Sequence, residues 1–377
     1  MTALASPRTL SLLAVLTLQS VAASRDSVSF DFGWKHRTGL HDWAPAGSEP
    51  PKHPDPGLRP PESTAKFDDA GWADVQLPHD GLIANNSYSD AACPNGCSGH
   101  SFIPRRVLWY RKEFTLPSSW KGSAVWLDFE GSFRNTTVWI NGALAAQHDC
   151  GYTPFRVRLD NLTSVAYGAK STVAVYVDPD NGDLGGQEHG SGWWYEGGGL
   201  YRPVHLVRAS PVHIEQDGLF AYSNVSLANA GDAASATVHA SAAVVNTGAA
   251  AADVCVTFSI AAPDGSAAAP PPPAVPLSIA AGASAVARAT IAVAAPRLWS
   301  SASPTLYSVS AAVGACGGDD GDRSAPAYRS SSAAASDALT VPHGFRTLRY
   351  DADDGFFLNE EHFKVRGRAI LCAIRRN

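Results

Sequence analysis

Charged residues are scarce in this chain, and neither sign dominates strongly. Asp, Glu, Lys and Arg make up 17% of the 377 residues, below the roughly 25% that is typical of soluble domains. This composition excludes a highly charged disordered chain. The 29 basic residues are outnumbered by 35 acidic ones, for a net charge of −6. Without a basic excess to neutralise phosphates, a nucleic-acid partner is not expected.

Long hydrophobic runs are also missing. The apolar run Leu10–Leu18 is well short of the roughly 18 to 20 residues that a membrane-spanning helix needs. Arg8 precedes it and the small residues at 21–24 come after it, a pattern typical of a secretory signal peptide. We expect cleavage near Ala23 or Ser24, a secreted or lysosomal protein, and no membrane association after cleavage. An uncleaved membrane anchor is the alternative.

A secreted chain can carry N-glycans and disulfides. Sequons of the N-x-Ser/Thr type occur at Asn85, Asn135, Asn161 and Asn224, and these are the expected glycosylation sites in a eukaryotic host. The six cysteines are too few for a disulfide scaffold of this size.

Two cysteines lie close together in the sequence. We expect Cys93 and Cys97 to close a small disulfide loop, because a zinc site would need two further ligands and only His100 is near. No metal or other cofactor is predicted. Cys255 lies on a probable strand and is interpreted as a free thiol.

Gly and Pro together make up about 16% of the chain, above the average of about 12%, which favours many short strands over a helical bundle. Alternation with a period of two indicates strands around Val125–Phe129, Val138–Ile140, Val173–Val177 and Val204–Leu206. In the first of these, Val125, Leu127 and Phe129 are expected to face a core, with the other face exposed. The dipeptide Asn141-Gly142 predicts a type I′ hairpin turn. The proline-rich stretch 43–61 is interpreted as a surface loop.

The composition shifts to Ala, Val, Ser and Thr from about residue 211. Further strands are expected at 237–246, 254–260, 284–293, 306–313 and 337–341, separated by low-complexity loops at 270–273 and 317–336. The fold class is therefore all-β. We predict a signal peptide (1–24), a jelly-roll sandwich (25–209), an immunoglobulin-like sandwich (210–342) and a tail (343–377).

Seven motifs in order carry a family resemblance. They are FDDAGWADVQLPHD at 67–80, WYRKEF from Trp109, FEGSFRNTTVWING from Phe129, GYTPFRVRLDNLT from Gly151, GWWYEGGGLYRPV at 192–204, PRLWSSASPTLY at 296–307, and GFRTLR with DGFFLN at 344–349 and 354–359. This set resembles the N-terminal part of glycoside hydrolase family 2, most closely its β-galactosidase branch. The resemblance implies a sugar-binding-type first domain and identifies the tail as a truncated start of a (β/α)₈ barrel.

The motif at 192–204 holds the candidate binding residues. Trp193, Trp194 and Glu196 are a candidate contact with sugar, because aromatic rings stack on sugar C–H faces and a carboxylate binds hydroxyls; packing between domains is the alternative. Gly197–Gly199 is not interpreted as a phosphate cradle, since no Lys-Ser/Thr comes after it. His79-Asp80 is a weak dyad, because no nucleophile elbow accompanies it.

No catalytic residue is assigned in this chain. By resemblance, the parent enzyme would be a retaining glycosidase with two glutamates on a barrel, and a barrel needs about 250 residues. Only about 35 residues come after the second sandwich, so the catalytic barrel is expected to be missing and the chain inactive alone. Asn359-Glu360 is not its acid/base pair, because the family has a turn there.

The resemblance thus implies the N-terminal portion of a glycosidase acting on β-linked glycans, most closely β-galactosides. A stand-alone secreted carbohydrate-binding protein is the alternative. The sequence gives no indication of oligomeric state.

Overall fold

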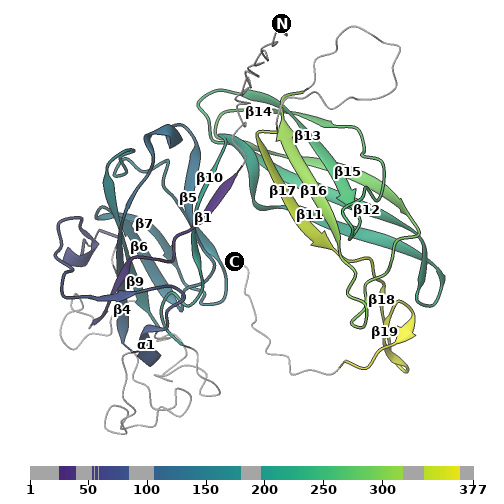
Figure 1. The fold of residues 1–377 in the computed structure, drawn as a ribbon, viewed down its shortest axis with the longest axis horizontal. Helices are drawn as coiled ribbons and strands as arrows, with labels where there is room; N and C mark the ends of the chain where they lie inside the picture. Colours follow the sequence, from purple (N-terminus) through teal and green to yellow (C-terminus); the bar gives the residue numbers. More distant parts are fainter. Residues whose placement is uncertain are drawn as a thin grey trace, which may run out of the picture.

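The chain folds into two β-sandwiches that lie side by side (Figure 1). The structure is a computed structural model, and it describes residues 25–39, 53–54, 56–57, 59–84, 106–179, 197–316 and 335–365. Each sandwich has its own hydrophobic core, one drawn from residues 30–206 and the other from residues 214–345. The all-β prediction is confirmed. Within the described ranges, no helix is long and apolar enough to cross a membrane.

The first sandwich consists of two sheets. One has the order β1-β10-β5-β8 and the other the order β3-β2-β4-β9-β6-β7. Their strands are β1 (Asp26–Ser29), β2 (Trp34–Gly39), β3 (Ala73–Val75), β4 (Val107–Thr115), β5 (Ala124–Phe129), β6 (Asn135–Ile140), β7 (Ala143–His148), β8 (Phe155–Arg158), β9 (Lys170–Asp178) and β10 (Val204–Ala209). The only α-helix in the described chain is the single turn α1 (Gly81–Ala84).

Strand β5 is buried on both faces, which corrects the expectation of a half-exposed strand. Val125, Leu127 and Phe129 point into the core between the sheets, as predicted. The opposite face holds Trp126, 3% exposed, in a second apolar cluster. Trp126 stacks on His213 of the second sandwich at a centroid distance of 5.6 Å. The neighbouring sandwich therefore covers the face for which alternation predicted solvent.

The outer face of the six-stranded sheet also carries an aromatic cluster. Trp109 stacks on Trp139 at 5.6 Å and meets Tyr176 edge-on at 5.3 Å. Trp72 belongs to the same cluster and is 8% exposed, so its ring packs within the fold. The hairpin between β6 and β7 turns at Asn141 (φ 52°) and Gly142 (φ 82°). These positive φ values are those of the predicted type I′ turn.

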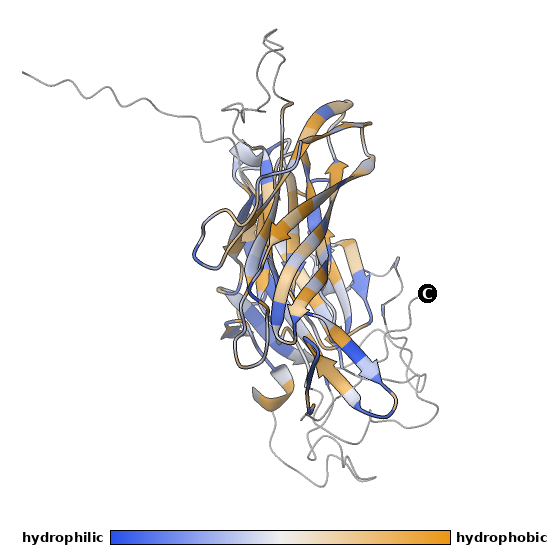
Figure 2. Ribbon diagram, turned by 90° about the vertical axis from the view of Figure 1, so that its right-hand side faces the viewer, coloured by the Kyte–Doolittle hydropathy of each residue, from blue (hydrophilic) through white to orange (hydrophobic). Residues whose placement is uncertain are grey.

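The second sandwich has seven strands, divided between a three-stranded and a four-stranded sheet, as an immunoglobulin-like fold requires. Their orders are β11-β12-β15 and β14-β13-β16-β17. The strands are β11 (Val212–Asn229), β12 (Asp232–Asn246), β13 (Ala252–Ala261), β14 (Val275–Ile279), β15 (Ser284–Ala294), β16 (Tyr307–Gly314) and β17 (Asp337–His343). In Figure 2, hydrophobic residues gather along the strands of the molecule.

The alternation pattern did not predict strands β11 and β14. In β11 the pairing with β12 shifts register between Ile214 and Leu219. Asp217 there has a φ of 58°. This irregularity breaks the period of two on which the prediction relied.

The interpretation of Cys255 as a free thiol is wrong. Cys255 on β13 forms a disulfide with Cys316, 61 residues further along the chain. Cys255 is only partly buried and Cys316 is exposed, so the two thiols meet at the margin of the sheet. Alternation along β13 located the strand correctly. It carried no information that Cys316, two residues after the end of β16, lies beside Cys255. Cys93 and Cys97 lie outside the described residues.

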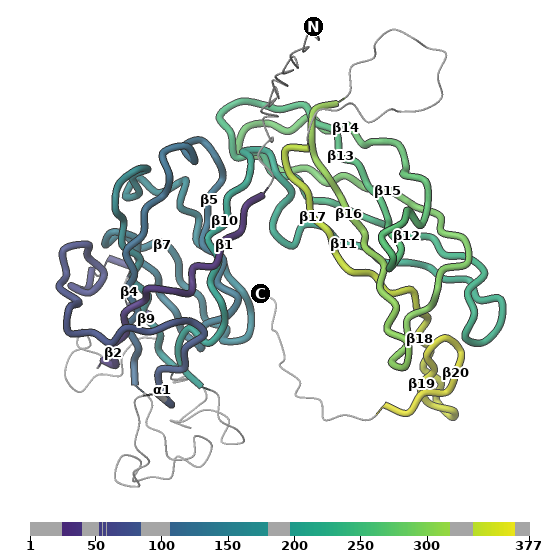
Figure 3. The backbone as a smooth tube through the Cα atoms, in the orientation of Figure 1, coloured from purple at the N-terminus to yellow at the C-terminus, as the bar shows by residue number. Residues whose placement is uncertain are grey.

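The chain continues past the second sandwich into a small sheet, visible as the yellow end of the trace in Figure 3. Its strands are β18 (Leu348–Asp351), β19 (Gly355–Leu358) and β20 (Glu361–His362). The predicted division after residue 342 puts His343 and Phe345 in the tail, whereas the structure buries both in the second sandwich. The start of a barrel remains a prediction, since residues 366–377 lie outside the described ranges.

Candidate functional site at the glycine segment

The structure describes only the base of the candidate site, which is the segment Gly197–Leu200 with the residues that contact it. Trp193, Trp194 and Glu196 lie outside the described residues, and the chain is described again from Gly197. The segment Gly197–Leu200 is completely buried. It comes three residues before β10, which begins at Val204.

Backbone hydrogen bonds hold this segment on two sides. On one side, the amides of Gly81 and His79 donate to the carbonyl oxygens of Gly198 (2.9 Å) and Leu200 (2.8 Å). On the other side, Gly199 exchanges two hydrogen bonds of 2.9 Å with Phe133. The segment is thus an internal strand-like bridge between two loops, and its backbone is fixed before any ligand arrives.

Glycine is required at position 199. Its φ is 117°, a conformation that other residues rarely adopt. A Cβ there would overlap the hydroxyl of Tyr110. A Cβ at Gly198 would lie 2.7 Å from the side chain of Leu82. The glycine run therefore serves close packing, consistent with the exclusion of a phosphate cradle.

The Tyr110 hydroxyl lies at the centre of this base. It is within hydrogen-bond distance of Nδ1 of His79 (3.0 Å) and donates to the His79 carbonyl oxygen at 3.4 Å. Burial raises the pKa of Tyr110 well above its usual range, and hydrogen bonds from the backbone at Leu200 and Gly81 partly oppose that rise. The hydroxyl therefore stays protonated and joins the segments around positions 80 and 200.

Two histidines pack against this tyrosine. The His36 and His79 rings lie 4.8 Å apart, and His36 lies 4.8 Å from the Tyr110 ring. Burial, and secondarily the neighbouring His79, lowers the pKa of His36. A hydrogen bond to the Trp109 carbonyl oxygen opposes the shift, and the resulting pKa is about 4. Burial also lowers the pKa of His79, against the attraction of Asp80. Both rings are neutral at pH 7.

Asp80 has a local structural role. Its Oδ1 accepts hydrogen bonds from the amides of Leu82 (3.0 Å) and Ile83 (3.2 Å), which caps α1. The adjacent His79 is bound to Tyr110 instead. The pair is therefore not arranged as a catalytic dyad, in agreement with the absence of a nucleophile elbow from the sequence.

The far side of the base is aromatic and partly open. Phe133 meets Tyr152 edge-on at 5.5 Å, and Tyr152 is 41% exposed. The Tyr201 hydroxyl donates to the Gly151 carbonyl oxygen at 2.6 Å. These residues come from three separate sequence motifs. Their spacing along the sequence does not show that they lie together in the fold. The base offers rings and polar groups for binding, and the described residues contain no group of His, Cys, Asp or Glu suited to a metal.

The predicted glycosylation sites differ in accessibility. Asn161 and Asn224 are exposed, and Asn85 lies outside the described residues. Asn135 is 3% exposed within β6, between β7 and β9. The expectation at Asn135 is therefore corrected, because an interior strand leaves no room for a glycan on this side chain.

Comparison with known proteins places this fold. The family model for glycosyl hydrolases family 2 matches residues 212–323. A β-glucuronidase from Formosa agariphila is 26% identical over 318 residues, which cover 80% of this chain and 29% of that protein. A β-galactosidase from Bacteroides ovatus is 27% identical over 301 residues, which cover 80% of this chain and 31% of that protein. The chain is similar to glycoside hydrolase family 2 in its second sandwich, and to these two relatives over most of its length.

The same architecture recurs in solved structures. A family 2 member from Bacteroides cellulosilyticus superposes with a TM-score of 0.67 at 24% identity, covering 90% of this chain and 39% of that one. This chain thus spans about a third of the length of the relatives it matches. The named relatives divide between β-glucuronidases and β-galactosidases.

Proposed function

We propose that this chain is the N-terminal, non-catalytic portion of a secreted or lysosomal retaining glycosidase of family 2 that hydrolyses β-linked glycans, with β-galactosides as its substrates. In this proposal, bond cleavage belongs to two carboxylates of a catalytic barrel outside the two sandwiches. The two sandwiches contribute a scaffold and one rim of the substrate pocket.

The observation that carries this proposal is the fixed base of the glycine segment. Gly198, Gly199 and Leu200 are hydrogen-bonded to loops on both sides, so this segment has a defined position without a ligand. A binding group held in place before the ligand arrives loses less conformational entropy on binding. We take Trp193, Trp194 and Glu196, which come just before this segment in the sequence, as the side chains of the proposed rim for sugar.

The rim is tested in the enzyme extended beyond Gly367 by sequencing its transcript. Trp193→Ala, Trp194→Ala and Glu196→Gln should each lower kcat/KM at unchanged thermal stability if the side chains touch substrate. Trp120→Ala is a matched control, since Trp120 is a partly buried tryptophan on a short 3₁₀ turn of the same sandwich. It should lower stability without changing kcat/KM per folded molecule. The same pattern in the rim variants would leave only a packing role.

The transcript also decides between enzyme and binding protein. Barrel codons after Gly367 support the proposal, whereas a confirmed stop after Asn377 supports a stand-alone carbohydrate-binding protein. Comparing β-galactoside with β-glucuronide turnover in the extended enzyme then tests the substrate class.

A further inference from the structure

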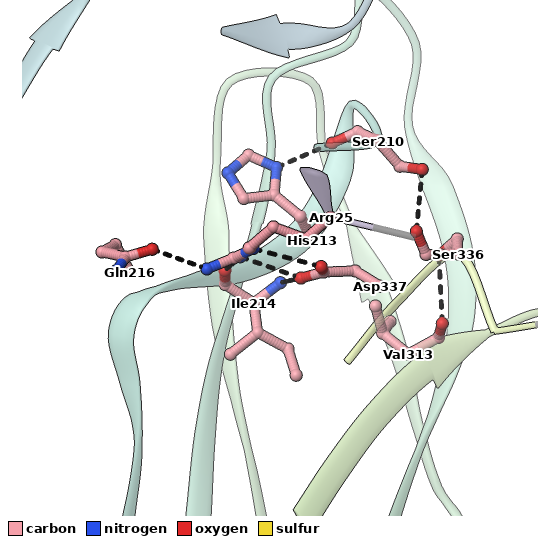
Figure 4. Close-up of polar contacts among 8 residues, drawn as sticks. All are labelled: Arg25, Ser210, His213, Ile214, Gln216, Val313, Ser336 and Asp337. Atoms are coloured by element: carbon pink, nitrogen blue, oxygen red, sulfur yellow. Dashed lines mark hydrogen bonds and ion pairs between the residues drawn. The ribbon is translucent and has the colours of Figure 1, made fainter. Parts of the chain in front are cut away.

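The start of the described chain reaches out of the first sandwich into the second. Arg25 directly precedes β1, which pairs with β10 in the first sandwich. Its side chain nevertheless ends among residues of β11 and β17 (Figure 4). It contacts both sheets of the second sandwich at the edge where they meet.

The Arg25 guanidinium is fully engaged there. Nε and Nη2 donate to the two carboxylate oxygens of Asp337, at 3.2 and 2.9 Å. Nη1 donates to Oε1 of Gln216 at 2.8 Å, and Nη2 also donates to the Ile214 carbonyl oxygen. The Arg25 and Asp337 side chains are 9% and 0% exposed. The forked pair is therefore shielded from water and from screening by salt.

Asp337 is held by β11 as well. Its Oδ2 accepts the amide of Ile214 at 2.8 Å. Without Arg25 this carboxylate would stay buried but lose its ion pair with the guanidinium. Removing one partner of a buried pair is strongly destabilising.

The same guanidinium contacts the first sandwich. It lies 5.5 Å from the ring centroid of Trp126 on β5, within the range of a cation–π interaction. Trp126 in turn stacks on His213, whose Nδ1 lies 2.8 Å from the Ser210 carbonyl oxygen. The Ser210 hydroxyl donates to the Ser336 carbonyl oxygen at 2.9 Å. These contacts surround the short connection between β10, which ends at Ala209, and β11, which begins at Val212.

We propose that Arg25 is a clamp that fixes the orientation of the two sandwiches. The two residues that connect β10 to β11 would alone let the sandwiches rotate relative to each other. The forked ion pair between Arg25 and Asp337 prevents this rotation. The clamp also sets a requirement on processing: removal of a signal peptide at Ala23 or Ser24 keeps Arg25, whereas trimming by one or two more residues removes the clamp and leaves both cores intact.

The test compares variants of the mature chain by calorimetry and small-angle X-ray scattering. The wild type should unfold in one transition. Arg25→Ala should split the unfolding into two transitions and raise the radius of gyration. Arg37→Ala is the matched control, because Arg37 also pairs with a carboxylate, Glu62 at 2.7 Å, and lies over a tryptophan, Trp72 at 5.2 Å, but entirely within the first sandwich. It should keep the single transition.

Arg25→Lys guards against a variant that does not fold. It keeps the charge but lacks the fork, so it should show partial separation of the transitions. The proposal is overturned if the wild type already unfolds in two independent transitions. It is also overturned if Arg25→Ala leaves the unfolding transition and the scattering curve unchanged. If the alanine variant does not fold, the same result for Arg25→Lys overturns it.

Discussion

The two sandwiches have similar layers but differ in what fills them. Nine of the ten tryptophans lie before residue 210, and the other, Trp299, lies after it. The first core is rich in large rings, and its strands β4, β5, β6 and β9 are buried on both faces over most of their length. The second core consists largely of Val, Ala and Ile, and β12 and β16 alternate regularly between more and less buried residues.

This difference separates the roles of the two sandwiches. Large rings buried on both faces create fixed points such as Tyr110, on which a loop for binding can be built. Small residues on longer, regular strands give a simple two-layer spacer, and a disulfide adds to its stability. The candidate site is accordingly in the first sandwich, and the next predictions are ordered by the expected size of the effect.

The largest effect is expected from truncating a ring in the first core. Phe129 is fully buried and stacks on Phe155 at 4.7 Å. Phe129→Ala should lower the free energy of unfolding of the first sandwich by about 3–5 kcal/mol, because it removes buried area and leaves a cavity. Val309→Ala at an equally buried site of β16 should cost less, roughly two methylene groups or about 1.6 kcal/mol. Equal losses, measured by chemical denaturation, would show that the two cores do not differ in this way.

The disulfide should matter only to the second sandwich. Replacing Cys255 and Cys316 by alanine should lower the free energy of unfolding by about 2–4 kcal/mol, because closing a long loop restricts the unfolded chain. Cys150→Ser is the control, since Cys150 is free in the structure. Equal destabilisation of both sandwiches in the variant without Cys255 and Cys316 would contradict this assignment.

Acid should weaken the first sandwich through His36. Its pKa falls from 6.5 when unfolded to about 4 in the fold, so the unfolded state binds the proton first as the pH drops. Stability is unaffected above pH 6.5 and is lost progressively between pH 6.5 and 4, by an amount on the order of 3 kcal/mol. His36→Gln should flatten this part of the profile of melting temperature against pH. An unchanged profile would mean that the pKa of His36 does not differ between the folded and unfolded states.

The sequence predicted the regular parts of this chain and missed those that depend on distant contacts. Alternation located β5, β9, β13 and β16, and Asn141-Gly142 located a turn, because those signals are local. Burial of Trp126, the Cys255–Cys316 bond and the position of Arg25 each depend on a partner far away in the sequence. The same holds for the site: the glycine run is evident in the sequence, but its dependence on Tyr110 and Phe133 is not.

The central claim is that this chain binds and positions without cleaving. It is tested most directly by assaying the purified chain on chromogenic β-galactoside, β-glucuronide and β-mannoside substrates. No turnover above a blank is predicted, because the proposed function assigns both catalytic carboxylates to a barrel outside the two sandwiches. Turnover that disappears on Glu360→Gln would contradict the claim and give this chain a catalytic residue of its own.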